Sequence, residues 1–275
     1  EFEMPDDREL EKYEHVKLSL SAFFDPLLGC LDESVGDTIK QVPLFHAKLQ
    51  VKFPASKQEP TKEVMSCGLD ASTAGLRAIG EALSIRASVN LGVPHQQVVT
   101  GFDEEDWRKK AAAIALANAR GFAEKAKAAQ LNMLHLEDEE MQLIIRFLMS
   151  AGFQTQSLQL YWNAENTCFV ARLPALDGHK LITGIAANAQ EAIKDCLCAT
   201  YIRLQFPDTE LLPTYGEDLE LPKPEVIDES GELLRQVSSA PAGALPAINF
   251  VQGEQLLTSH GIYTGYATLT SEEVV

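Results

Sequence analysis

The sequence is short of basic side chains and of long apolar runs, and each shortage excludes a class of protein. Its 275 residues include 23 lysines and arginines against 40 aspartates and glutamates, which gives a formal net charge of −17. Such a chain repels nucleic-acid phosphates and anionic lipid surfaces. No apolar run reaches the roughly 20 residues of a membrane-spanning helix, and the acidic N-terminus has no apolar signal core. We therefore expect a cytoplasmic protein that binds neither nucleic acid nor membrane.

Cysteines and familiar catalytic motifs are also scarce. Five cysteines, an odd number, are a poor basis for a disulfide scaffold in a chain of this length. Cys196 and Cys198 are close in sequence, but residues two apart on a helix point in different directions and chelate zinc poorly, so buried thiols are favoured. Walker-type loops, dinucleotide fingerprints, nucleophile elbows and H-E-x-x-H are absent. The sequence therefore predicts no metal site.

The apolar residues that are present follow strand and helix periods, which predicts an α/β fold. The content of 45% hydrophobic and 23% charged residues is typical of a globular protein. Strict alternation over residues 44–53 predicts a half-buried strand with His46 on its polar face, as a surface histidine. The predicted strands are 44–53, 153–162, 167–173 and 181–186, and the predicted helices are 73–90, 104–133, 138–151 and 189–206.

Several residues of the first two helices have a predicted local role. Ser72 and Asp103 are the expected N-caps. The basic run Arg108-Lys109-Lys110 follows three acidic residues, so we interpret it as a solvated helix face. Gly75 and Gly80 each cost about 1 kcal/mol of helix stability relative to alanine, which indicates close packing against another element.

Composition divides the chain into three parts. Residues 1–17 form an N-terminal segment whose first three residues, ahead of Met4, we interpret as a cloning remnant. Residues 18–206 hold the predicted α/β domain. Residues 207–275 form an extension with six prolines, and from Phe206 onward twelve acidic residues face two basic ones. Prolines and excess charge limit helix formation in this extension.

The extension carries structural predictions of its own. Residues 228–231 are suited to a hairpin turn, and residues 247–252 and 261–269 have strand-like composition. Their apolar side chains favour a strand pair that packs on the main domain or on a second subunit. An open edge strand would accept a partner by strand addition, and an intramolecular appendage without a partner is the alternative.

Two stretches of the chain repeat one plan. The first is strand 44–53, then the turn 67–72 with Gly68, then a helix; the second is strand 167–173, then the turn 183–188 with Gly184, then a helix. α/β folds reuse this unit widely. The repetition predicts two related halves whose helices face each other, a natural place for a nucleotide.

Three segments resemble the YcaO family. The segment Ala22-Phe23-Phe24-Asp25-Pro26-Leu27-Leu28-Gly29 resembles the turn that opens YcaO domains. The segment Cys67-Gly68-Leu69-Asp70 and the helix after it resemble the family's first glutamate helix, in which Glu81 matches the first glutamate. Residues 142–199 resemble the later part: helix, strands, glycine turn and a second alanine-rich helix.

The resemblance covers roughly residues 18–91 and 136–205. It implies an α/β fold with YcaO-like mixed sheets, packed helices and two related strand–turn–helix halves. YcaO enzymes use ATP to phosphorylate a backbone amide oxygen of a ribosomal peptide, which leads to an azoline or a thioamide. Glutamates on their motif helices hold Mg²⁺ and the phosphates, since hard cations prefer oxygen ligands. The resemblance thus implies Glu81, Gly68 and Asp70 as cofactor-binding residues.

Each of these residues also has an ordinary structural interpretation. Glu81 suits a helix surface or a buried, paired carboxylate. An aspartate such as Asp70 is common in turns for local reasons. Gly68 and Gly184 either let a phosphate approach a helix N-terminus or serve simple packing.

The sequence departs from the family pattern where the chemistry is carried. Ser84 and Ile85 replace a Glu–Arg pair, and Ala199 stands where the second helix should carry a glutamate. The central glycine-rich stretch and its glutamate helix are missing between Trp107 and Asp138. One glutamate cannot organise Mg²⁺ sites, so we expect a degenerate relative with no cofactor, or with ATP and Mg²⁺ should the site be functional.

Three functions are compatible with these features. The first is a non-catalytic YcaO-like partner or scaffold in ribosomal-peptide backbone modification or a related assembly, acting through protein or peptide contacts. The second is an active ATP- and Mg²⁺-dependent cyclodehydratase or thioamidation enzyme. The third is an unrelated α/β binding module. The missing glutamates favour the first over the second, and the sequence leaves a homo-oligomer open.

Overall fold

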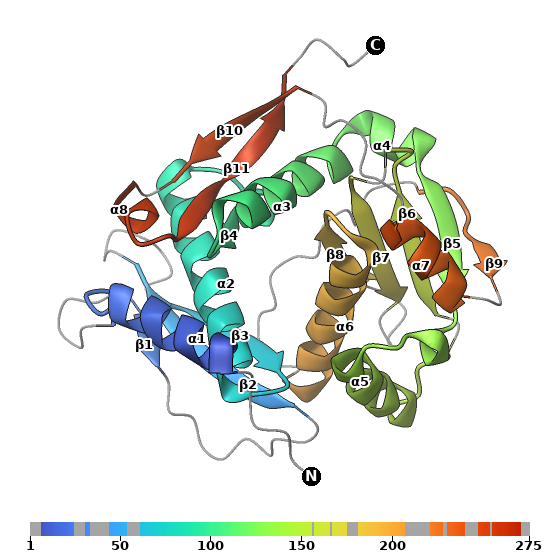
Figure 1. The fold of residues 1–275 in the computed structure, drawn as a ribbon, viewed down its shortest axis with the longest axis horizontal. Coiled ribbons are helices and arrows are strands. Elements are labelled where there is room, and N and C mark those ends of the chain that lie inside the picture. The colour runs from blue at the N-terminus through green and yellow to red at the C-terminus, as the bar shows by residue number, and fades with distance from the viewer. Residues whose placement is uncertain are drawn as a thin grey trace.

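The computed structural model describes most of the chain as alternating layers of sheets and helices (Figure 1). The described residues are 7–24, 31–33, 44–53, 61–155, 157–165, 167–174, 181–206, 221–227, 230–239, 247–253 and 255–270. The interpreted cloning remnant and the Asp25–Gly29 turn lie outside them. Helices together with antiparallel and mixed sheets confirm the α/β class.

The first layer is an antiparallel sheet covered by two helices. β1 (Leu31–Glu33), β2 (Phe45–Lys52) and β3 (Thr61–Gly68) pair in that order. α2 (Ala71–Leu91) packs on β2 and β3, and α1 (Asp7–Ser19) packs on α2. As the alternation predicts, Leu49 and Val51 of β2 are buried in the core beneath α2.

The second sheet joins segments that are far apart in the sequence. β11 (Tyr263–Leu269) lies between β10 (Ile248–Gln252) and β4 (Val99–Gly101) and is antiparallel to both. α2 and α3 (Glu104–Ala117) both contact β11. Trp107 of α3 is 1% exposed and packs against two aromatic rings of this sheet, so the predicted strand pair at 247–269 exists and packs on the main part of the chain.

The third sheet is five-stranded and mixed, in the order β8-β7-β6-β5-β9. Its strands are β5 (Lys127–Leu131), β6 (Leu158–Trp162), β7 (Phe169–Pro174), β8 (Leu181–Ala186) and β9 (Glu225–Ile227), and only the β5–β9 pair is parallel. One face packs on α5 (Glu139–Ser150), α6 (Ala189–Gln205) and α7 (Ser230–Ser239), and the other packs on α3. The short helices are η1 (His95–Gln97), α4 (Arg120–Lys125), η2 (Met133–His135) and α8 (Gln255–Thr258).

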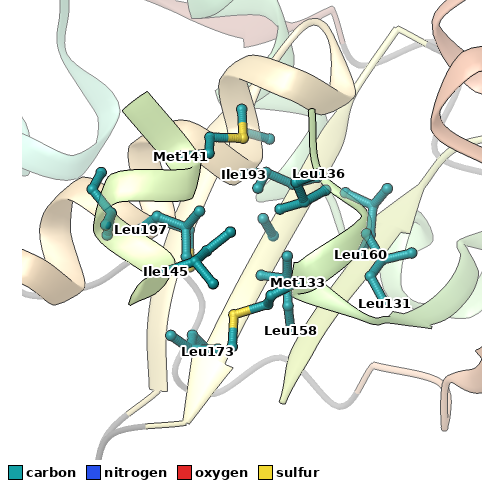
Figure 2. Close-up of a cluster of buried hydrophobic side chains, with 14 of the residues drawn as sticks. Leu131, Met133, Leu136, Met141, Ile145, Leu158, Leu160, Leu173, Ile193 and Leu197 are labelled. Atoms are coloured by element: carbon teal, nitrogen blue, oxygen red, sulfur yellow. The ribbon is translucent and has the colours of Figure 1, made fainter. Parts of the chain in front are cut away.

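A large apolar core joins this third sheet to its helices. Figure 2 shows Met141 and Ile145 of α5 and Ile193 and Leu197 of α6 gathered with side chains of the strands. The strand residues in the view include Leu158 of β6, and its side chain is fully buried. Each such leucine or isoleucine contributes roughly 1.5–3 kcal/mol when fully buried, so this core fixes α6 rigidly on its sheet.

The two halves share one plan of hairpin and helix, where the sequence had predicted a strand, a turn and a helix. β2–β3–α2 is matched by β7–β8–α6, and Asp70 and Asn188 cap the two helices by accepting a backbone N–H three residues on, at 2.7 and 2.8 Å. When the two cap residues are aligned, the helices after them match as predicted. The turns before the caps, however, are offset by two residues relative to the predicted match. Gly68 and Gly184 therefore do not occupy equivalent positions.

Three sequence predictions are wrong. The helix predicted over 104–133 ends at Ala117, because the alanine-rich segment after it forms α4 and then β5, where pairing with β6 and β9 outweighs local helix propensity. Cys67 and Gly68, expected in the turn 67–72, instead end β3. In the predicted hairpin turn at 228–231, Ser230 and Gly231 instead begin α7, and the two residues before them lie outside the described part.

Local roles need correction at three residues. Ser72 is buried in the first turn of α2, and the N-cap is Asp70. His46 is not a surface histidine: its ring stacks on Tyr201 at 5.5 Å, and burial lowers its pKa. Gly75 does pack closely, since a Cβ there would lie 2.5 Å from the Tyr13 ring, whereas Gly80 has ordinary space.

Asp103 and Asp138 show where capping patterns succeed. Asp103 caps α3 by accepting two backbone N–H groups, as predicted, and Asp138 caps α5.

Among the described residues, no helix combines the length and apolarity needed to cross a membrane.

We expect Gly184→Ala to destabilise the fold by roughly 2 to 3 kcal/mol, because a Cβ there would meet the backbone of α6 at Ala192 and Cys196. Urea unfolding followed by circular dichroism measures this loss. Gly121→Ala is the matched control: a Cβ there meets nothing within 4 Å, and alanine favours the helix, so stability should stay level or rise. Equal effects at both positions would contradict the packing argument.

Candidate functional site

Charged side chains lie on the sides of α2 and α6 that face each other. Arg77 and Glu81 are four residues apart on α2 and therefore share one face, as do Glu191 and Asp195 on α6. Arg77 Nη1 lies 3.7 Å from Cys198 Sγ, which brings the two helices into direct side-chain contact. This confirms that the helices of the two halves face each other.

We call Glu81, His95, Lys110 and Asp195 the Glu81 cluster. His95 Nε2 of η1 lies 3.3 Å from Glu81 Oε1, and Lys110 Nζ of α3 lies 3.3 Å from Asp195 Oδ2. Four elements thus bring together two carboxylates, an imidazole and an ammonium group. The imidazole contact lacks hydrogen-bond geometry, since neither ring nitrogen of His95 has a hydrogen-bond partner.

Protein surrounds this cluster closely enough to change its charge state. Burial, opposed by the nearby charge of Lys110, raises the pKa of Glu81 to about 7. Burial and then Lys62 lower the pKa of His95 to about 4, so at neutral pH the imidazole is uncharged. The Asp195 carboxylate raises the pKa of Lys110. Glu81 still keeps 40% of its side-chain surface accessible, so solvent protons reach it.

The cluster does not fit a divalent metal. Mg²⁺ requires several ionised oxygen ligands in near-octahedral geometry. Here Glu81 is only partly ionised near pH 7, and the Asp195 charge is offset by Lys110. Within the described ranges, no group of three or more His, Cys, Asp and Glu side chains is placed to hold an ion. The cluster can exchange a proton at Glu81 and can present the Lys110 ammonium to an anion.

The structure does not bring Gly68 and Asp70 to Glu81. Both oxygens of Asp70 bind Thr73, at 2.7 Å to its backbone nitrogen and 2.9 Å to its hydroxyl. A Cβ on Gly68 would lie 2.8 Å from the nitrogen of Ala74, so glycine is needed where β3 approaches the start of α2. Eleven residues of helix separate Asp70 from Glu81, about 16 Å along the axis. Capping and packing account for both residues.

A second set of charges, the Arg77 network, ties α2 to α5 and α6. The Glu140 carboxylate is 2% exposed and receives both Arg77 guanidinium nitrogens, at 2.6 and 3.1 Å. Lys194 Nζ adds a contact of 2.7 Å to Glu140 and one of 3.4 Å to Asp138. Burial lowers the pKa of Arg77, but the bonds to Glu140 outweigh this and raise it overall. Two cations thus satisfy one buried anion.

The positions where YcaO glutamates were expected serve packing. Ser84 is 4% exposed, and its hydroxyl binds the Gly80 carbonyl at 3.0 Å and Thr100 Oγ1 at 2.9 Å. Ile85 is buried in the core beneath α2, and Ala199 is half-buried on α6. None of these side chains could take the place of a carboxylate.

The sequence pointed to Glu81 but missed its neighbours. Arg108 and Lys109 do pair with glutamates four residues before them, as a solvated helix face predicts. Lys110 does not, because it faces Asp195 across the interface of α3 and α6. His95 belongs to no sequence motif, and only tertiary structure brings it to Glu81. For α6, the four-residue spacing of Glu191 and Asp195 was the sequence feature that could have indicated a charged helix face.

Comparison with known proteins bears on the fold alone. The structure of YcaO from Methanopyrus kandleri, bound with AMPPCP and Mg²⁺, matches with a TM-score of 0.53 and 12% identity, over 96% of this chain and 90% of that chain. No family model and no curated protein sequence matches the chain. The chain therefore has a YcaO-like fold, as its sequence motifs suggested.

Removing the Glu140 carboxylate should be costly, because Arg77 and Lys194 would lose their buried partner. We expect Glu140→Leu to lower the free energy of unfolding by about 3 kcal/mol, and Arg77→Met in the same chain to restore part of it. Chemical denaturation of both variants measures this. Glu105→Ala, which removes an exposed pair with Lys109, should cost less than about 0.5 kcal/mol. A similar cost at Glu140 would refute the role of the network.

The raised pKa of Glu81 predicts a pH-dependent stability difference between Glu81→Gln and the wild type. From pH 4.5, its ordinary value, to about 7, the unfolded chain releases a proton that the native protein keeps. The wild type therefore loses stability through this window, whereas glutamine does not ionise. The advantage of Glu81→Gln should grow up to about pH 7 and then level off. Parallel unfolding curves against pH measure it, with Glu105→Gln as a control for loss of a surface carboxylate. A constant difference across the window would count against it.

Proposed function

We propose that this chain is a YcaO-like protein that does not catalyse ATP-dependent phosphorylation of peptide amides. It acts instead as a partner or scaffold subunit, through protein or peptide contacts, in ribosomal-peptide backbone modification or a related assembly. The observation that carries the proposal is the Glu81 cluster, where Lys110 and a neutral His95 accompany the two carboxylates.

The charge of the cluster supports this proposal. Phosphoryl transfer needs metal ions that neutralise the charge developing on the phosphates. A lysine beside Asp195 and a carboxyl with a pKa of about 7 together weaken the attraction for Mg²⁺. Gly68 and Asp70 have structural roles that account for them. The cluster thus lies between the two halves, where a nucleotide was expected, but it lacks a set of metal ligands.

The surface supports a role in contacts. Large apolar side chains are exposed on separate elements: Leu18 of α1 is 75% exposed, Val226 of β9 61% and Leu134 of η2 50%. The C-terminal part supplies both β9 and β10, which are edge strands in their sheets. Edge strands can pair with an added strand of a partner. The net charge of −17 favours a partner with a basic surface.

A second candidate is an active ATP- and Mg²⁺-dependent enzyme with a rearranged site. One observation favours it: the YcaO structure that this fold matches holds AMPPCP and Mg²⁺. In that case Glu81 would carry part of the metal site, and nucleotide phosphates would lie near Lys110.

Phosphate release and calorimetry separate the two candidates. We expect the wild-type chain to release no phosphate from ATP above the background of Glu81→Ala, and to bind AMPPCP no more tightly with Mg²⁺ than without it. Lys110→Ala is the informative partner variant, because it removes the cation that offsets Asp195 and should improve the response to Mg²⁺. Robust Mg²⁺-dependent phosphate release that Glu81→Ala abolishes would overturn the proposal in favour of the enzyme.

A further inference from the structure

Two cysteines from different halves meet beside Arg77. Cys67 lies near the end of β3 and Cys198 lies on α6, two elements that pack against each other. Arg77 Nη1 donates to the Cys67 carbonyl at 2.8 Å and lies 3.7 Å from Cys198 Sγ. The Cys67 thiol also lies close enough to Cys198 to raise the pKa of the Cys198 thiol. One guanidinium nitrogen therefore contacts both cysteines.

The two thiols differ in access. Cys67 is 1% exposed, while Cys198 is only partly buried. Cys168 and Cys196, the other cysteines in the described part of the chain, are fully buried, and their thiols donate to carbonyls of Ala113 and Ile182. Cys198 is thus the more exposed residue of the pair, and Cys67 is the thiol beside it.

We propose that Cys67 and Cys198 close into a reversible disulfide that fastens β3 to α6 when the chain meets a hydroperoxide. The Cys198 sulfur attacks the peroxide, whose O–O bond breaks to give a sulfenic acid and release water or an alcohol. The Cys67 sulfur then attacks the sulfenic sulfur, the S–O bond breaks, and a second water leaves with the thiol proton. The two sulfurs are oxidised and the peroxide is reduced, so atoms and electrons balance.

The environment of the pair keeps it reduced at rest. The neighbouring Cys67 thiol and burial raise the pKa of Cys198, so the reactive thiolate is rare near neutral pH. The adjacent Arg77 guanidinium favours the thiolate once it forms. Reaction is therefore slow and requires sustained oxidant.

The disulfide would act on the interface of the two halves. It would replace a thiol contact by a covalent link between segments far apart in the sequence, and so restrict the unfolded chain. The inference does not depend on whether the Glu81 cluster binds a nucleotide.

The test uses the full chain carrying Cys30→Ser, which removes the cysteine outside the described residues. Hydrogen peroxide in small excess should remove two hydrogen atoms by intact mass, and non-reducing peptide mapping should show a Cys67–Cys198 link. The Tm should rise by roughly 5 to 10 °C and return on reduction with dithiothreitol. Cys67→Ser and Cys198→Ala should each lose the link and the Tm shift, and Cys168→Ala should keep both.

Three results would overturn the proposal. One is a disulfide that involves Cys168 or Cys196 in equal yield. Another is conversion of Cys198 to sulfinic acid without a crosslink. The third is a Cys67–Cys198 disulfide that leaves the Tm unchanged, which would show that the link does not fasten the two halves.

Discussion

The buried carboxylate of Glu140 is the constraint on which the relation between the halves depends. At 2% exposure it needs cations on both oxygens, and Arg77 from α2 and Lys194 from α6 supply them. Leaving a buried charge without its partners costs several kcal/mol, so the three helices cannot drift apart independently. Because Glu81 lies one turn beyond Arg77, and Asp195 beside Lys194, the same contact fixes how the Glu81 cluster is assembled.

The Glu81 cluster shows how the surroundings of a carboxylate set its charge. α2 and α3 lie between sheets, so the charges that face α6 sit where protein limits their hydration. A carboxyl there ionises with difficulty, and a nearby lysine is held in its charged form by Asp195. The balance of charge in such a place is decided by one or two side chains, which is why a YcaO-like fold does not by itself establish YcaO chemistry.

The sequence predicted the elements whose signal is local. Alternation in β2, the Asp103 cap and the helices α2 and α6 of the two halves all follow from neighbouring residues. β5 was missed because its alanines favour a helix, and only its partners β6 and β9 make it a strand. Glu81 was found through a motif, whereas Lys110 and His95 reach it through tertiary packing, and no spacing in the sequence records that approach.

The pairing of β11 with β4 has a consequence for the order of folding. β4, near residue 100, pairs with β11, beyond residue 260, so this sheet is completed by a contact of very long sequence separation. Such contacts form late, because the loop they close costs entropy before any contact repays it. Until β11 arrives, the indole of Trp107 lacks the ring of Tyr263 above it. During synthesis on a ribosome, Trp107 therefore emerges long before the strand whose ring covers it.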